Sequence, residues 1–154
     1  MKCVVVAVAA SVLLAGCSQG PPAPELTLQQ FMKDKVDPTS KIYFDAVQYI
    51  SDETGNHDIV PQTDADWEKV RQAAADLQAQ GKELQTPGYT EGRNPDWTQF
   101  SQSLVEAGQQ AEQAAKDKDP DKVFEVAGTV YAVCDACHMA YPADSTQPGG
   151  GGAS

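Results

Sequence analysis

The sequence predicts an all-α protein, an antiparallel four-helix bundle. Three observations lead to this fold class. The chain of 154 residues has room for one compact domain of ordinary size. Apolar residues recur at spacings of three and four in four segments, as they do on the buried face of a helix. Connections between these segments are short and none reads as a strand run, so neighbouring helices should pack antiparallel.

The first segment, 26–50, reads "LTLQQFMKDKVDPTSKIYFDAVQYI". Its apolar side chains, Met32 among them, form one broad helical face. Pro38 interrupts the pattern, because proline cannot donate the helical hydrogen bond and its ring crowds the preceding turn. We therefore expect either a kink at this point or two helices joined with Asp37 as the cap.

The second segment, 63–84, begins at a capping-box pair, since Thr63 stands three residues before Asp66. Apolar residues then follow at alternating spacings of three and four, which is the seam of a bundle. The connection before it, 51–62, is the longest and the one predicted to hold irregular structure.

The last two segments begin alike, with "NPDW" from Asn94 and "DPDK" from Asp119. Each pattern places a capping side chain before a proline at the first helical position. The apolar seam of the fourth segment, 119–141, includes Cys134 and Cys137, so both thiols are predicted to point inward.

The N-terminal stretch is typical of an export signal, with one positive charge followed by an apolar run too short to span a membrane. "LAGC" before Cys17 resembles a bacterial lipobox, in which that cysteine is lipidated after cleavage. The predicted organisation is a signal peptide at 1–16, a lipidated Cys17 with a Pro-rich tether at 17–25, the helical domain at 26–143 and a disordered Gly-rich tail at 144–154. We expect an exported, periplasm-facing protein anchored by lipid to a bacterial membrane. The outer membrane is favoured because the residue after the cysteine is Ser18 and not the aspartate that often signals retention in the inner membrane.

Acidic residues outnumber basic ones, 22 to 11. Such a surface repels phosphate backbones, so nucleic acid is not an expected partner. A protein partner steered by charge would present a basic patch. Solubility alone would also account for this composition.

The stretch "CDACH" places Cys134, Cys137 and His138 on one side of a helix, because positions i, i+3 and i+4 are neighbours there. Three kinds of site have this pattern: a thiol redox pair, half of a zinc site and the attachment point of a c-type haem. Zinc would need two further ligands, and His57 is the only other histidine. A redox pair belongs at the start of a helix, where the dipole lowers a thiol pKa; here the pair lies near a helix end. The pattern therefore favours one covalent haem c.

The chain resembles the class II cytochromes c, the cytochrome c-prime family and its low-spin relatives. The resemblance covers about residues 26–142 and depends on "CDACHMAY", "FMKDKVDP", "PQTDADW" and the Trp-led third segment. It implies that Cys134 and Cys137 carry the haem through thioethers and that His138 is the proximal iron ligand. Pro142 stands where many members have a basic residue. Arg71 and Arg93 are weak candidates for contacts with the haem propionates.

The resemblance also implies a ligand on the other side of the iron. Low-spin members supply a methionine from the early part of the first helix, where this chain has Met32. The alternatives are that Met32 only fills the core or that His57 folds over the haem from its loop.

The sequence thus predicts an electron carrier with His138 and Met32 as axial ligands, and not an enzyme. The alternative of the same class is a five-coordinate cytochrome c-prime that binds nitric oxide or carbon monoxide. A thiol oxidoreductase is the alternative from the enzyme class. Redox proteins are the expected partners, and the resemblance allows a homodimer through the first two helices.

Overall fold

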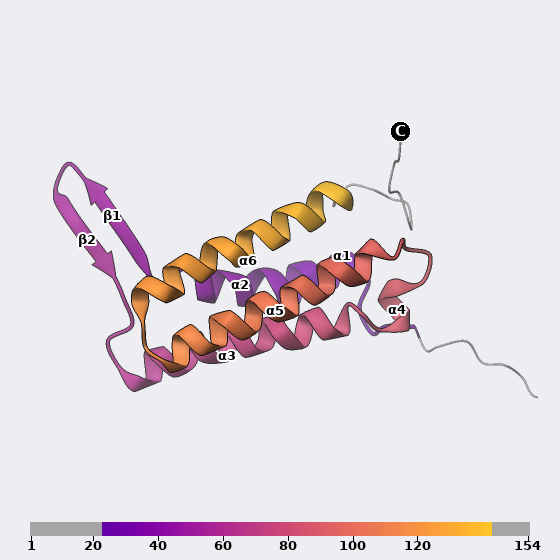
Figure 1. Cartoon of the computed structure of the whole chain (residues 1–154), viewed down its shortest axis with the longest axis horizontal. Helices are drawn as coiled ribbons and strands as arrows, with labels where there is room; N and C mark the ends of the chain where they lie inside the picture. Colours follow the sequence, from indigo (N-terminus) through magenta and orange to yellow (C-terminus); the bar gives the residue numbers. More distant parts are fainter. Residues whose placement is uncertain (1–22, 143–154) are drawn as a thin grey trace, which may run out of the picture.

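The computed structural model describes residues 23–142, and this part of the chain is mostly helical with a small two-stranded sheet (Figure 1). The elements are α1 (Leu28–Phe31), η1 (Met32–Val36), α2 (Asp37–Phe44), β1 (Gln48–Asp52), β2 (Gly55–Ile59), α3 (Asp64–Glu83), α4 (Pro87–Thr90), α5 (Asp96–Lys116) and α6 (Pro120–Ala140). The predicted signal peptide, the lipidation of Cys17 and the predicted disorder of the tail from residue 144 lie outside the described residues.

Helix α5 lies between α3 and α6, and these three helices run in alternating directions along the long axis (Figure 1). Small residues allow α3 and α5 to approach closely. A Cβ added to Gly81 would lie 2.9 Å from a methyl of Val105, and one added to Gly108 would lie 2.8 Å from the Gln78 side chain. The hydrophobic core between the helices is rich in alanine and valine, and Leu77 is fully buried in it.

Local capping chemistry confirms two of the predicted helix starts. The Thr63 hydroxyl accepts from the backbone N–H of Asp66, and the Asp66 carboxylate accepts in return from the Thr63 N–H. At the start of α6, the Asp119 side chain accepts from the N–H of Lys122 at 3.0 Å, with Pro120 in the first turn. Each cap satisfies backbone donors that the helix itself leaves unpaired.

The first helical stretch crosses Pro38 without ending. Residues from α1 through η1 to α2 keep helical backbone angles, and Asp37 lies inside the stretch with its N–H bonded to the Met32 carbonyl, five residues earlier. The alternative of two helices capped by Asp37 is therefore wrong. A π-turn is wider than an α-turn, which is expected to relieve the clash between the proline ring and the preceding carbonyls.

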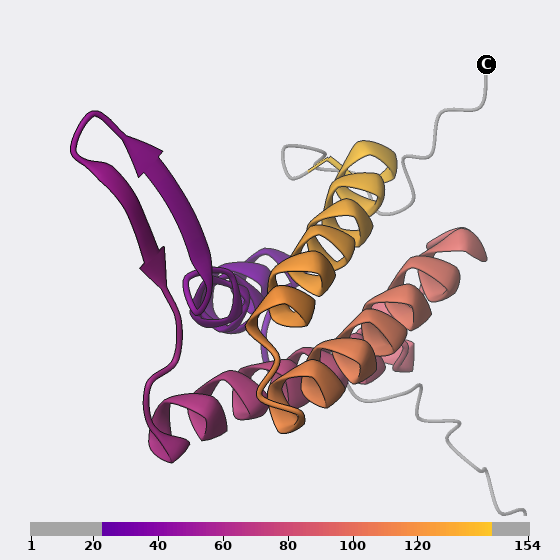
Figure 2. The ribbon, with the colours of Figure 1, turned by 60° about the vertical axis from the view of Figure 1, so that its left-hand side comes forward.

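The prediction of an all-α domain is wrong at residues 48–59, which form a β-hairpin. Helix α2 ends at Phe44, six residues before the predicted end of the first segment. Strands β1 and β2 pair antiparallel, with Gln48 opposite Ile59 and Asp52 opposite Gly55. Gly55 has φ 127°, a backbone conformation that glycine adopts without steric cost. Figures 1 and 2 show the hairpin projecting beyond the helices.

Two smaller differences concern the third helix and the connection before it. Helix α5 begins at Asp96, one residue later than predicted, and Pro95 lies just outside it. The connection between α3 and α5 holds the short helix α4, which the sequence did not predict. The Tyr89 side chain of α4 is buried, and its hydroxyl donates to the Leu26 carbonyl at 3.0 Å. Helix α4 therefore closes one end of the core.

Candidate functional site

The last two turns of α6 carry Cys134, Cys137 and His138. The buried face of α6 is formed by three valines, Val123, Val126 and Val130. Both cysteines continue this face, half-buried against the hydrophobic core, as the sequence predicted. Neither thiol is in a disulfide, so both are available for covalent attachment.

Burial raises the pKa of both thiols. For Cys134, burial is the cause of the raised pKa. For Cys137, burial is the largest cause, and the neighbouring Cys134 and the Asp96 carboxylate raise the pKa further, to about 11. Thiol–disulfide exchange proceeds through the thiolate, and reactive cysteines have lowered pKa values. This environment therefore does not favour a thiol oxidoreductase.

The imidazole of His138 is exposed, unlike the thiols beside it. His138 follows Tyr131 by seven residues, so both lie along one flank of α6, next to the face that carries Cys134. Tyr131 lines a groove with the end of α2, which places this flank on the side of the first helical stretch. Helix α2 packs mainly on α3 and touches α6 at few places. The flank that carries His138 thus adjoins the side on which α2 and α6 make few contacts.

Met32 lies at the first position of η1, half-buried against the core. The first helical stretch begins at the end of the molecule where α6 finishes (Figure 1). The structure therefore brings Met32 and the "CDACH" residues to the same end. Phe31, the neighbour of Met32, is buried there and its ring lies 5.2 Å from that of Tyr89.

An aromatic contact fastens the end of α6 to the start of α5. Figures 1 and 2 show the last turns of α6 standing apart from the first turns of α5. Tyr141 bridges this separation, because its hydroxyl donates to Asp96 at 2.5 Å and its ring lies 5.0 Å from Trp97 in an edge-on arrangement. The indole of Trp97 is buried and donates to the Leu84 carbonyl at 2.7 Å. Sequence reasoning missed Asp96, whose partner is 45 residues away.

The two arginines have different surroundings. The Arg71 guanidinium donates to Glu68 at 2.6 Å and to Glu112 at 2.9 Å, which ties it to the surface between α3 and α5. Arg93 lies over the Trp97 ring, 4.4 Å from its centroid, and donates to the Tyr89 carbonyl. Of the two arginines, Arg93 is the one placed beside the end of α6.

His57 is far from the "CDACH" residues in the fold. It belongs to β2, where its Nε2 lies 2.6 Å from the Thr54 hydroxyl and 3.3 Å from the Asp52 carboxylate. The hairpin projects from the end of the molecule opposite the last turn of α6 (Figure 1). This position does not favour His57 as an iron ligand.

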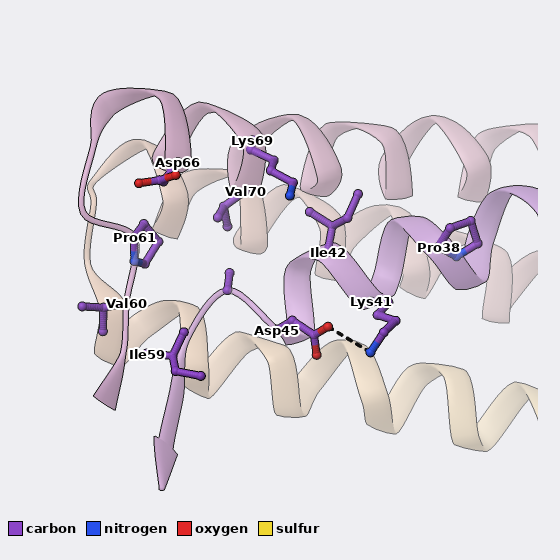
Figure 3. A pocket seen from close by; sticks show the side chains of 11 residues that line it. Pro38, Lys41, Ile42, Asp45, Ile59, Val60, Pro61, Asp66, Lys69 and Val70 are labelled. Atoms are coloured by element: carbon purple, nitrogen blue, oxygen red, sulfur yellow. Dashed lines mark ion pairs between the residues drawn. The ribbon is translucent and has the colours of Figure 1, made fainter. Parts of the chain in front are cut away.

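Two cavities lie elsewhere on the surface. The larger, of about 610 Å³, is lined by α2, the end of β2 and the first turns of α3, with the Lys41–Asp45 ion pair at its edge (Figure 3). The smaller, of about 410 Å³, lies between β1 and α6. The "CDACH" residues line neither cavity.

Within residues 23–142, no cluster of three or more His, Cys, Asp or Glu side chains is arranged to hold a metal ion. None of the helices in this part of the chain combines the length and apolarity needed to cross a bilayer. Comparison of the chain with protein-family models, with curated proteins and with solved structures gives no match.

Proposed function

We propose that the chain is a monohaem c-type cytochrome of the class II kind that carries electrons. The first helical stretch, α3, α5 and α6 would form the four-helix bundle around the haem. One observation carries the proposal: the last turns of α6 present two half-buried thiols and, on the adjoining flank, an exposed imidazole. Two thioethers and one axial nitrogen from a single helix end are what a covalent haem requires.

Each residue of this site would have a different role. Cys134 and Cys137 would hold the haem from the side of the core, and His138 would ligate the iron from the flank of α6 that is open toward the first helical stretch. Met32 would be the second axial ligand. A bound haem supplies an iron centre that changes by one electron between ferric and ferrous states, and a filled sixth position suits electron transfer.

The structure also offers a feature that favours the five-coordinate alternative. Met32 packs against the hydrophobic core, as a residue that merely fills space would do. Carbon monoxide added to the ferrous protein separates the two functions. Little binding is expected for Met32 ligation, whereas rapid and complete binding would indicate an open site for small gases.

The intact mass of the purified protein tests the proposal as a whole. Attachment of one haem through two thioethers should add the mass of haem to the chain, and the absorption spectrum should change on reduction. Replacing Cys134 and Cys137 by alanine should abolish the covalent adduct. A wild-type chain without the added mass, produced in cells that mature other c-type cytochromes, would refute the haem assignment. Export and lipid attachment at Cys17 belong to the same proposal and are supported by the sequence pattern.

A further inference from the structure

A groove between β1 and α6 gathers exposed apolar side chains. Seven large apolar residues are exposed within residues 23–142, and four of them, Tyr49, Ile50, Phe124 and Tyr131, line this groove. Their exposure is high, at 43% for Tyr49, 50% for Phe124 and 64% for Tyr131. Single exposed apolar residues are ordinary on a protein surface, but a cluster around one concavity marks an interaction site.

The groove is built by specific contacts. The Tyr49 hydroxyl donates to Asp121 at 2.5 Å, and the Tyr49 ring lies 5.1 Å from the Phe124 ring. These contacts fasten β1 to the first turns of α6. Phe44, the last residue of α2, and Val47, in the connection between α2 and β1, also line it, and Val47 is buried. The concavity is therefore already formed before a partner arrives, which lowers the entropy cost of binding.

The rim of the groove is acidic. Asp58 stands opposite Tyr49 in the hairpin register. The hydrogen bond to Asp121 and the nearby charges of Asp58 and Asp119 contribute to raising the pKa of Tyr49 to about 12. The lysine of the first turns of α6, Lys122, is paired with Glu125 at 2.8 Å. The larger cavity differs, because its Lys41 and Asp45 neutralise each other.

We propose that this groove is the docking site for a protein that inserts an apolar side chain surrounded by lysine or arginine. The acidic rim determines which kind of partner fits the groove. A second copy of this chain would bring a net charge of −11 against an acidic rim, and an anionic lipid surface would be repelled in the same way. A basic, partly apolar protein surface is complementary in both respects.

The position of the groove indicates what the partner does, and this step rests on the proposed function. Tyr131 precedes Cys134 by three residues on α6, about 4.5 Å along the helix axis. A protein seated on Tyr131 and Phe124 would lie next to the proposed haem attachment. The expected partner is therefore a basic redox protein.

Binding can be measured by calorimetry on the full-length protein with a defined probe. The probe is a helical peptide with leucine on one face and lysine along its flanks. Two matched peptides replace either the lysines by glutamate or the leucines by serine. The Leu/Lys peptide should bind best, and added salt should weaken its binding. Phe124→Ser should weaken it at least about tenfold, and Asp58→Lys should also weaken it.

Two control variants remove comparable groups elsewhere. Ile42→Ser takes an exposed apolar side chain from α2 outside the groove, and Glu106→Lys reverses an exposed charge on α5. Both should bind the peptide as the wild type does. Equal binding by Phe124→Ser and wild type would overturn the proposal, as would equal binding of the glutamate peptide. So would self-association, or binding to anionic vesicles, that Phe124→Ser abolishes.

A second measurement addresses the redox role. Ferric mitochondrial-type cytochrome c serves as a basic redox probe, and the rate at which the reduced protein transfers electrons to it is followed by stopped flow. Phe124→Ser should lower the second-order rate constant for electron transfer to the probe about tenfold, in parallel with the loss of binding. A chain without haem would fail only this measurement and would refute the proposed function. A haem-bearing chain with an unchanged rate for Phe124→Ser would refute the docking site alone.

Discussion

In the proposed cytochrome, electron transfer and gas binding differ in whether Met32 ligates the iron, and substitution of Met32 separates the two. Met32→Ala removes the thioether and keeps Cys134, Cys137 and His138, the residues that would hold the proposed haem. The variant should still be a covalent holoprotein, but its ferric iron should become high-spin and its ferrous iron should bind carbon monoxide. Because Met32 is only half-buried, the free energy of unfolding should fall by about 2 kcal/mol, the low end for a core methionine.

Met139→Ala is the matched control, since it is the same substitution at a side chain that is 71% exposed. Its absorption spectrum and stability should equal those of the wild type. Thermal unfolding should be recorded for both variants before their spectra are compared. If Met32→Ala is folded and remains low-spin, a different group fills the sixth position and Met32 is not the ligand.

Residue-scale chemistry was predictable where it is local. The Thr63–Asp66 pair and the Asp119 cap were recognised because both partners of each bond lie within one helical turn. The hydrogen bond from Tyr141 to Asp96 joins residues 45 positions apart, and no local sequence pattern predicts it. The inward direction of Cys134 and Cys137 followed from helical periodicity, but the exposure of His138 depends on how closely α2 approaches α6.

At the scale of elements, α3 and α5 are joined by an ion-pair network around Glu112. This carboxylate accepts from Arg71 at 2.9 Å and from Gln78 at 2.9 Å, and Lys116 lies 2.8 Å away. The hydrogen bonds from Lys116, Gln78 and Arg71 lower the pKa of Glu112 to about 2 from an ordinary value of 4.5. A lowered folded-state pKa stabilises the fold above pH 4.5, and the contribution is lost as the pH falls toward about 2.

Glu112→Gln should therefore lower the free energy of unfolding at pH 7 by about 1 to 3 kcal/mol. The difference from wild type should shrink as the pH falls through the window from 4.5 to 2. Chemical denaturation at a series of pH values measures it. Glu106→Gln, an exposed substitution on the same helix, should leave the profile unchanged. A difference that stays constant with pH would show that Glu112 acts through shape and not through its charge.

The π-turn in the first helical stretch follows from the positions of its buried residues. Phe31 and Val36 are both buried and five residues apart, which is the spacing of a π-turn and not of an α-turn. From α3, the Gln80 side chain donates to the Lys35 carbonyl at 3.3 Å and to the Thr39 hydroxyl at 2.9 Å. The sequence signalled a disturbance through Pro38, but the extra residue depends on packing against α3.

Deleting the exposed Lys33 should convert the π-turn into an α-turn, since Phe31 and Val36 would then be four residues apart. The Pro38 ring would clash with the preceding carbonyl, at a cost of about 3 kcal/mol. The same deletion combined with Pro38→Ala should recover most of that stability, while Pro38→Ala alone should change it little. Denaturant unfolding of the four proteins measures the coupling. Equal destabilisation by the deletion in both backgrounds would show that Pro38 does not require the π-turn.

At the scale of the whole molecule, the helices and the hairpin have different origins in the sequence. Long apolar periodicities predicted α3, α5 and α6, because each buries a continuous face. The hairpin was missed because Tyr49 and Ile50 also fit the helical spacing of the preceding segment. Its turn at Gly55 is the local signal that favours strands. Both hairpin strands are largely exposed, so their pairing leaves little apolar pattern to recognise.

Replacing residues 48–59 by a short Gly-Ser linker should therefore leave the helical body intact. Hairpin residues are absent from the buried core, and the contacts that would be lost include those of Tyr49 with Asp121 and Phe124. Circular dichroism per helical residue and the covalent haem mass should be unchanged, with a melting temperature within a few degrees of wild type. Trp97→Ala, which empties a buried site, should instead cost about 3 to 5 kcal/mol. The shortened protein should lose affinity for the Leu/Lys peptide, because one wall of the groove would be gone.

A chain that fails to fold without the hairpin would show that the hairpin is required for folding. Peptide binding would then be tested with Phe124→Ser and Asp58→Lys in place of the shortened protein.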